Sequence, residues 1–165
     1  LGYMAQKFSL YGNLTLRQNL EFFASVYGIN FLNKDKRVDE IIDIFNFHDI
    51  QDMKSQDLPL GFKQRLSLAC AVIHNPPILF LDEPTSGVDV IARREFWNHI
   101  TSLAKLGVTI LVTTHFMDEA EYCNRISLFY KGETIALGTP YELKTKAKAD
   151  NMEQAFVNLI KESGK

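Results

Sequence analysis

Apolar residues recur at helical spacing in the first half of the chain, in three segments separated by turn-forming residues. The segments cover residues 15–27, 35–47 and 61–74. Thr15 and Gln18 stand three positions apart, a capping-box pattern that marks the start of the first segment. The spacing therefore predicts three amphipathic helices in this region.

The middle of the chain alternates between strand-like and helix-like patterns. Residues 78–81 form a short, wholly apolar run, which is typical of a strand covered on both faces, and residues 108–113 are rich in β-branched side chains. A helical pattern over residues 89–106 connects the two runs. A strand, a helix and a second strand at this spacing predict a βαβ unit, whose strands are parallel neighbours or near-neighbours in one sheet.

The end of the chain predicts a strand pair followed by two helical segments. The strands cover residues 126–130 and 134–137 and turn at Lys131 and Gly132, while Asn151 can cap the last helix. Together the patterns predict an α/β fold, in which a parallel sheet is flanked by helices and a group of helices precedes it.

Composition excludes several classes of protein. The chain has 165 residues, of which 46% are hydrophobic and 23% are charged, as expected for an ordinary globular domain or part of one. Its 18 basic and 20 acidic residues give a formal charge of −2, with no basic block or stripe. We therefore expect no nucleic acid partner.

Cysteine spacing and apolar runs bear on the cellular setting. Cys70 and Cys123 are isolated, which predicts two buried, reduced thiols in a cytosolic protein. The longest apolar runs, residues 77–81 and 108–112, are too short to cross a bilayer. The chain opens on Leu1 without a signal-peptide pattern, which argues against secretion and suggests an excerpt from a longer polypeptide.

Two carboxylates directly follow the predicted strand at 78–81. Open α/β sheets place their ligands at the carboxyl ends of strands, where Asp82 and Glu83 stand. Asp82 is placed to hold Mg²⁺ directly or through water, and Glu83 could polarise an attacking water molecule. An acidic turn that caps a helix is the competing interpretation for an isolated pair of this kind.

Four motifs together favour the catalytic interpretation, because the sequence resembles the ABC ATPase family along nearly its whole length. Leu81-Asp82-Glu83-Pro84 resembles the Walker B motif with its catalytic glutamate, and Gly2-Tyr3-Met4-Ala5-Gln6 resembles the Q-loop. Ser86-Gly87-Val88-Asp89 resembles the D-loop, with Val88 where leucine is commoner. Thr113-Thr114-His115 is similar to the switch-histidine motif. The motifs occur in the family's order and at plausible spacings.

The resemblance implies a partial P-loop NTPase (ABC ATPase) fold with an α-helical subdomain, and ATP and Mg²⁺ as cofactors. It implies that Gln6 touches the Mg²⁺ and its water network, and that His115 contacts the γ-phosphate and orients Glu83. It also implies that Asp82 and Gln6 hold Mg²⁺ together with a Ser or Thr of a Walker A loop. The resemblance also assigns nucleotide binding to four residues, which are Asp82, Gly61, Ser86 and Asp89.

Each of these residues also has a simpler interpretation. A lone glutamine is usually a polar surface residue, and a lone histidine after a strand is more often structural than catalytic, so only the shared context favours Gln6 and His115. Asp89 can cap the predicted helix at 89–106 while also serving in the D-loop. His48, His74 and His99 have no such context, and we expect them to be structural.

The family's signature motif, Leu-Ser-Gly-Gly-Gln, falls on Leu58-Pro59-Leu60-Gly61-Phe62 and matches poorly. In the family, the serine hydroxyl and glycine amides close over the γ-phosphate held by the other domain of a dimer. Pro59 offers neither a hydroxyl nor an N–H, and Leu60 adds bulk. Either the signature serves a weakened site, or the amides near Gly61 and the helix dipole suffice. We favour the second, because proline suits the first turn of a helix and Gly61 is present.

No Gly-x-x-x-x-Gly-Lys-Ser/Thr occurs in the sequence. The family places this phosphate loop before the Q-loop, so the resemblance implies that the chain lacks the first third of the domain. It further implies that a strand belonging inside the sheet is missing between residues 108–113 and 126–130.

Residues 117–126, 131–140 and 152–156 resemble the ABC-2, or drug-exporter, branch of the family. This branch implies a peripheral protein at the cytoplasmic face of the inner membrane, with a membrane permease and a second ABC ATPase domain as partners. The alternatives are a soluble ABC ATPase that acts on ribosomes or DNA, and a catalytically silent regulatory module. The sequence does not specify the exported substrate.

The resemblance also predicts four functional segments. Residues 1–13 form the Q-loop region, 14–75 a helical subdomain that ends with the signature and its helix, 76–139 the catalytic core, and 140–165 the terminal helices. The helical subdomain would be the arm that faces the permease.

Overall fold

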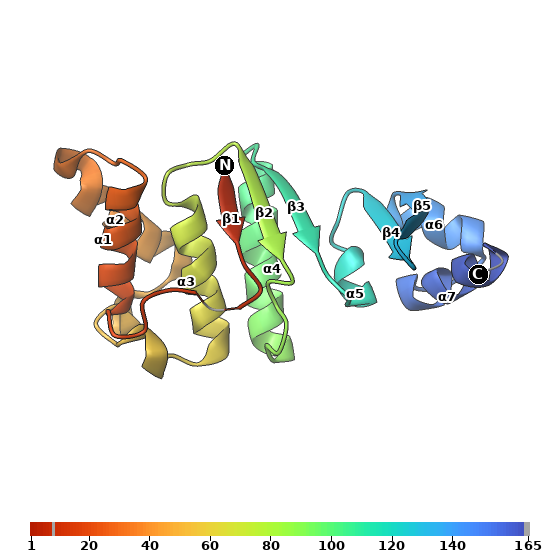
Figure 1. Ribbon diagram of the computed structural model, residues 1–165, viewed down its shortest axis with the longest axis horizontal. Coiled ribbons are helices and arrows are strands. Elements are labelled where there is room, and N and C mark those ends of the chain that lie inside the picture. The colour runs from red at the N-terminus through yellow and green to blue at the C-terminus, as the bar shows by residue number, and fades with distance from the viewer. Residues whose placement is uncertain (8, 164–165) are drawn as a thin grey trace. The chain divides into compact units, whose positions relative to one another are not determined.

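The computed structural model of the chain describes residues 1–7 and 9–163. These residues form two compact units, Leu1–Thr113 and Thr114–Lys165. Figure 1 shows the elements of each unit in chain order.

The first unit contains a three-stranded parallel sheet. Its strands are β1 (Gly2–Met4), β2 (Ile78–Asp82) and β3 (Thr109–Thr113), in the spatial order β1-β2-β3. The pairing of β2 with β3 in parallel confirms the predicted βαβ unit. The sequence did not predict β1, which pairs in parallel with β2 through only three residues.

Helices cover one face of this sheet. The helix α3 (Leu60–Val72) contacts β1, and α4 (Val90–Lys105), which lies behind the strands in Figure 1, contacts β3 and α3. Leu79 and Leu81 on β2 are therefore buried, at 0% and 1% exposure. These two leucines anchor the strand that carries the acidic pair.

The opposite face is not covered by the described residues. Ile78 and Phe80 are 43% and 36% exposed, so the prediction that this strand is buried on both faces is wrong. Successive strand residues point to opposite faces, and the packed helices bury only one of them. Tyr3, Phe80 and Leu111 stand in register on the exposed face and form an apolar row across three strands.

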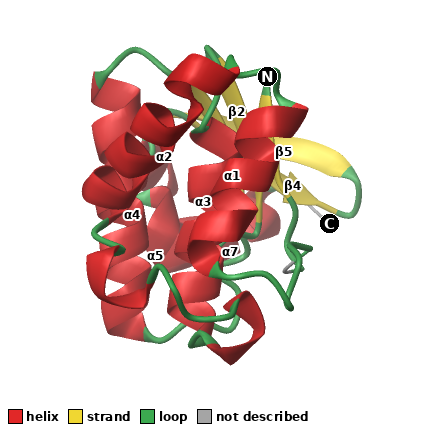
Figure 2. Ribbon diagram, turned by 90° about the vertical axis from the view of Figure 1, so that its left-hand side faces the viewer, coloured by secondary structure: helices red, strands yellow, loops and turns green. Residues whose placement is uncertain are grey.

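The predicted helices of the first half are present. The helices α1 (Leu16–Val26) and α2 (Phe31–Phe45) pack against each other, and α1 also packs against α3 (Figures 1 and 2). Thr15 and Gln18 form the predicted capping box of α1. The helix α2 begins before residue 35, because the Asn30 side chain accepts a hydrogen bond from the Leu32 N–H and caps the helix there.

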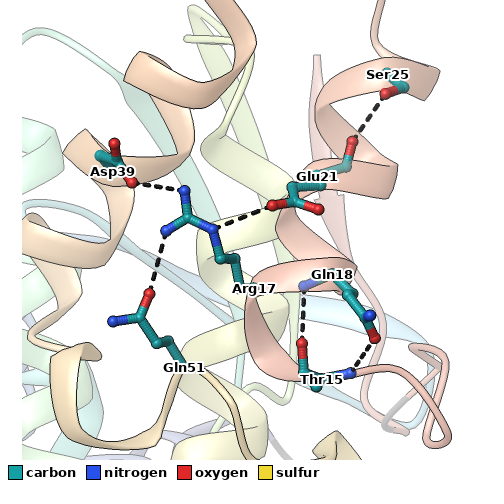
Figure 3. Close-up of polar contacts among 7 residues, drawn as sticks. All are labelled: Thr15, Arg17, Gln18, Glu21, Ser25, Asp39 and Gln51. Atoms are coloured by element: carbon teal, nitrogen blue, oxygen red, sulfur yellow. Dashed lines mark hydrogen bonds and ion pairs between the residues drawn. The ribbon is translucent and has the colours of Figure 1, made fainter.

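Arg17 connects α1 to its surroundings (Figure 3). Its guanidinium donates to Glu21 on the same helix at 3.1 Å, to Asp39 on α2 at 2.8 Å and to Gln51, just after the short 3-10 helix His48–Ile50, at 3.1 Å. The hydrogen bond to Asp39 is the main cause of the raised pKa of Arg17. The orientation of these helices is thus held by polar contacts as well as by apolar packing.

The second unit is built on a hairpin. The strands β4 (Ile126–Tyr130) and β5 (Glu133–Gly138) pair antiparallel, and both Lys131 and Gly132 have positive φ, as the predicted turn requires. The helices α5 (Met117–Ala120), α6 (Pro140–Ala147) and α7 (Met152–Glu162) complete the unit. Asn151 caps α7, as predicted, by accepting a hydrogen bond from the Gln154 N–H.

Candidate active site

The acidic pair lies where β2 ends, and the neighbouring strand holds it in place. Asp82 is the last residue of β2, and its Oδ1 accepts a 2.6 Å hydrogen bond from the Thr113 hydroxyl at the end of β3. The Glu83 N–H donates to both the carbonyl and the hydroxyl oxygen of Thr113, at 3.0 and 3.1 Å. Thr113 therefore fixes both acidic residues at the carboxyl edge of the sheet.

Glu83 has a left-handed backbone, with φ at +41°. This conformation costs a residue with a side chain about 1 kcal/mol or more, and such strain is found most often at functional sites. Here the conformation turns the chain out of the strand directly after Asp82.

Gln6 contacts Glu83 directly. The Gln6 Nε2 donates to Glu83 Oε2 at 2.7 Å, which joins residues 77 positions apart. Parallel pairing of β1 with β2 makes this contact possible, because Gln6 and Glu83 each follow the end of one of these strands. The structure thus brings together Gln6, Asp82 and Glu83, three of the residues predicted from sequence.

Gln64 is a further residue at this site, which the sequence did not single out. It lies on α3, is 2% exposed, and its Nε2 donates to the Gln6 carbonyl at 3.4 Å. The signal was a polar side chain within the apolar pattern of residues 61–74. Through Gln64, α3 contacts the backbone of the residue that reaches Glu83.

The segment after Glu83 turns sharply into α4. The Ser86 N–H donates to the Glu83 carbonyl at 3.1 Å, and Gly87 has φ at +75°. Asp89 then caps α4, since its Oδ1 accepts from the Ile91 and Ala92 N–H groups at 3.0 Å. The predicted cap is confirmed, while the roles of Ser86 and Asp89 toward nucleotide stay predictions.

The segment that resembles the signature motif begins α3. Pro59 takes the N-cap position with an extended backbone, and within the described residues no side chain caps this helix end. A Cβ placed on Gly61 would approach the Ala92 Cβ of α4 to 2.7 Å, which is closer than two such atoms can pack. Gly61 therefore has a packing reason to be glycine, independent of any phosphate.

Phe62 and Arg65 form the next turn of this helix. The Arg65 guanidinium lies 4.2 Å from the centroid of the Phe62 ring and 3.4 Å from a carboxylate oxygen of Glu95. Burial lowers the pKa of Arg65. The aromatic residue in the signature position thus packs on a cation of its own helix.

His115 belongs to the second unit, where its exposed ring lies against Phe116 with the ring centroids 4.1 Å apart. Thr114, beside it, donates from Oγ1 to Glu119 Oε2 at 2.6 Å. Glu119 is fully buried and was not singled out from the sequence. The role predicted for His115 toward Glu83 stays a prediction.

The comparison with known proteins decides the family. Residues 1–86 match the ABC transporter family. The chain belongs to this family.

Two curated relatives of this ABC protein are named as ATP-binding proteins. The chain is 57% identical to the probable multidrug ABC transporter ATP-binding protein YbhF of Escherichia coli (strain K12), with 97% of this chain and 28% of the relative aligned. It is 32% identical to the linearmycin resistance ATP-binding protein LnrL of Bacillus subtilis (strain 168), with 99% and 53% aligned. The chain therefore spans between about a quarter and a half of the length of these relatives.

Solved ABC structures share the fold. A structure described as the ATP binding subunit of an ABC transporter superimposes with a TM-score of 0.80 at 25% identity, covering 96% of this chain and 68% of its own. The structure of cbiO1 from Clostridium perfringens, part of the ABC transporter complex cbiONQ, gives 0.79 at 27% identity, with 88% and 59% covered. The predicted ABC ATPase fold class is confirmed.

The oxygen donors of this ABC protein suit magnesium only in part. Within the described residues no three His, Cys, Asp or Glu side chains gather as a metal site. Mg²⁺ is usually bound by one or two carboxylates together with phosphate oxygens and water. The Asp82 carboxylate and the Gln6 amide oxygen therefore fit an ion whose remaining ligands come from a nucleotide.

The other histidines have structural surroundings, as expected. The rings of His74 and His99 stack on Tyr27 and Phe45, with centroids 3.8 and 4.6 Å apart, and burial lowers the pKa of both. His48 lies 2.9 Å from a carboxylate oxygen of Asp43.

Both cysteines are free, but only one is fully buried. Burial raises the pKa of Cys70 strongly. Cys123 is half-buried, so the prediction of two buried thiols is wrong for this residue, which lies beside the short helix α5 rather than in the middle of a long one. Among the described residues, no helix has both the length and the apolar content needed to cross a bilayer.

The contact between Gly61 and Ala92 predicts a measurable coupling. Gly61→Ala is expected to destabilise the protein by about 1–3 kcal/mol, because the added methyl group overpacks the α3–α4 contact. Ala92→Gly in the same molecule should restore most of the loss, and thermal unfolding of the complete protein measures the coupling. If the double variant loses as much free energy of unfolding as the two single variants together, this packing role is contradicted.

Proposed function

We propose that this chain is part of the ATP-hydrolysing domain of an ABC transporter that powers export through a membrane permease. The observation that carries the proposal is the hydrogen bond between Gln6 and Glu83 beside Asp82, at the carboxyl edge of the sheet. A carboxylate that can take a proton, an amide that can orient a water molecule and an acid that can hold Mg²⁺ are the groups that phosphoryl transfer to water requires.

Each residue has a stated role in the proposal. Glu83 polarises the attacking water, and Gln6 aligns the Glu83 carboxylate and the water network. Asp82 would hold Mg²⁺ together with nucleotide oxygens and a hydroxyl of a Walker A loop, and a bound Mg²⁺ would supply positive charge beside the transferred phosphoryl group. His115 contacts the γ-phosphate.

The remaining nucleotide contacts come from residues at turns. Gly61, at the start of α3, offers backbone amides and a helix N-terminus to phosphate, while Ser86 and Asp89 line the turn after Glu83.

Export is supported by what the relatives are named for. The chain is similar to a probable multidrug transporter protein, to a linearmycin resistance protein and, at 37% identity over 87% of this chain and 42% of the relative, to the Nod factor export ATP-binding protein I of Sinorhizobium fredii (strain NBRC 101917 / NGR234). We infer a partner permease, a second ABC ATPase domain and a position at the cytoplasmic face of the inner membrane.

We propose four functional segments from the resemblance to the ABC ATPase family. Residues 1–13 are the Q-loop region, 14–75 the permease-facing helical subdomain, 76–139 the catalytic core and 140–165 the terminal helices. The packing of α1 on α2 and α3 supports treating the second segment as one body.

The Q-loop region predicts where the permease binds. Gln6, Leu10 and Tyr11 are expected to face a permease helix, and Phe8, predicted with them, lies outside the described residues. Tyr11 is 50% exposed, and its ring packs edge-on against Phe22 with centroids 4.7 Å apart, so an exposed aromatic surface follows Gln6 closely in the chain.

A cysteine at Tyr11 is therefore expected to cross-link to the permease in the assembled transporter. A cysteine at Leu106, which is 82% exposed at the end of α4, is the matched control and should not cross-link. Mass spectrometry of the adduct identifies the partner segment. Equal labelling from both sites, or none from Tyr11, would count against this surface.

ATP hydrolysis by the complete protein tests the proposal against its alternatives. A catalytically silent regulatory module would release no phosphate, and a soluble ABC ATPase acting on ribosomes or DNA would hydrolyse ATP without response to a permease. The transporter proposal expects hydrolysis that changes when the permease is present. We further propose that the 165 residues alone are inactive, because their sequence contains no Walker A loop.

A further inference from the structure

A buried carboxylate lies next to the candidate switch histidine. Glu119, on the short helix α5, is 0% exposed. Burying a charged group is costly unless it is hydrogen-bonded, so a glutamate in this position needs partners and a function.

A hydrogen bond of Glu119 leads directly to the histidine segment. The Thr114 hydroxyl donates to Glu119 Oε2 at 2.6 Å, and the same hydroxyl oxygen accepts a hydrogen bond from the Phe116 N–H at 3.1 Å. Thr114 and Phe116 are the two neighbours of His115 in sequence. The carboxylate therefore orients a hydroxyl that bridges the backbone across His115.

We propose that Glu119 is a positioning residue for His115, acting through Thr114. By accepting the hydrogen bond that the Thr114 hydroxyl donates, the carboxylate turns a hydroxyl lone pair toward the Phe116 N–H and keeps the backbone of residues 114–116 in one conformation. The exposed His115 side chain projects from this fixed turn. The inference rests on the proposed function, since the position of His115 matters to the reaction only if the protein hydrolyses ATP.

A carboxylate suits this task better than a neutral residue. It accepts without donating, so the Thr114 hydroxyl has a single choice of direction, and a charge-assisted O–H···O⁻ bond is short and strong. Removing the Glu119 carboxylate would leave the Thr114 hydroxyl without this acceptor. The loss is costly because Glu119 is fully buried.

The experiment compares Glu119→Ala, Thr114→Val and Thr114→Ser in the complete protein. Glu119→Ala and Thr114→Val are expected to lower kcat about tenfold or more with the KM for ATP changed less than about threefold, as for loss of an outer-shell partner. Thr114→Ser keeps the hydroxyl and should recover most of the rate. Glu119→Ala should add no further loss to a His115→Ala protein, because both changes remove the same contribution.

Two controls separate positioning from general stability. Leu128→Ala removes a side chain that is 4% exposed in the hydrophobic core of the same unit. It should lower the unfolding midpoint but leave kcat near that of the wild type. Amide hydrogen exchange across residues 114–119 should rise in Thr114→Val and Glu119→Ala and stay unchanged in Thr114→Ser.

The outcomes are distinct. If the wild-type protein hydrolyses ATP but Thr114→Val keeps its kcat, or if Glu119→Ala lowers the rate further in a His115→Ala protein, the positioning role is wrong. An equal loss of kcat in Leu128→Ala would also overturn it. If the wild-type protein hydrolyses no ATP, the proposed function fails, and unchanged hydrogen exchange in Thr114→Val would then refute the structural bridge itself.

Discussion

In the complete protein, Glu83→Gln is expected to lower steady-state ATP hydrolysis at least about a hundredfold while leaving ATP binding largely intact, the loss typical of a missing general base. The substitution preserves the size of the side chain, and glutamine can still accept the hydrogen bond that Gln6 donates at 2.7 Å. The left-handed backbone at this position is imposed equally on both residues. The change therefore removes the basic carboxylate and little else.

Phosphate release measures turnover, and equilibrium titration with Mg-ATP measures binding. Glu153→Gln, the same chemical change at an exposed position on α7, is the matched control and should leave both unchanged. Near-normal turnover by the Glu83→Gln protein would show that this residue is not the catalytic base.

The isolated 165-residue chain is expected to show neither useful ATP affinity nor hydrolysis. Most nucleotide affinity in such sites comes from backbone N–H groups and a lysine that cradle the β- and γ-phosphates, and the sequence contains no loop of this kind. One Mg²⁺-holding aspartate does not replace those donors. Isothermal titration of the purified chain with Mg-ATP measures this directly, with the complete protein as the positive control.

The same chain is expected to self-associate. Among the described residues β3 pairs only with β2, and the hairpin β4-β5 forms a separate sheet, so strand edges are open to pairing with other copies. The apolar row of Tyr3, Phe80 and Leu111 adds an exposed hydrophobic surface that favours association. Light scattering tests this expectation, and a monodisperse monomer that binds ATP at micromolar concentration would contradict both parts of the prediction.

Much of the fold could be predicted from local patterns. The capping box at Thr15, the parallel pair β2 and β3 and the turn at Lys131 and Gly132 all appear where the sequence places them. The strand β1 could not be predicted, because three residues carry no periodicity and its pairing partner lies more than 70 positions away. The exposure of one face of β2 was also missed, since an apolar run alone does not say which layers cover it.

The candidate site was predicted in its residues but not in its connections. Motifs identified Gln6 and Glu83, but their contact depends on the pairing of β1 with β2. Gln64 and Glu119 were missed because a helical pattern shows which positions are buried and not which partner a buried polar group meets. For such residues the useful signal is a polar side chain at a position that the pattern assigns to the core.

The left-handed backbone of Glu83 lowers the thermal stability of the protein at a residue that ATP turnover is proposed to need. Glycine adopts this φ freely, so replacing Glu83 by glycine would relax about 1 kcal/mol of strain and give a more robust protein that has lost its acid. Selection or engineering for thermostability alone would thus drift toward inactive forms at this position. A more stable protein that still works has to gain its stability at other positions and keep the strained glutamate at residue 83.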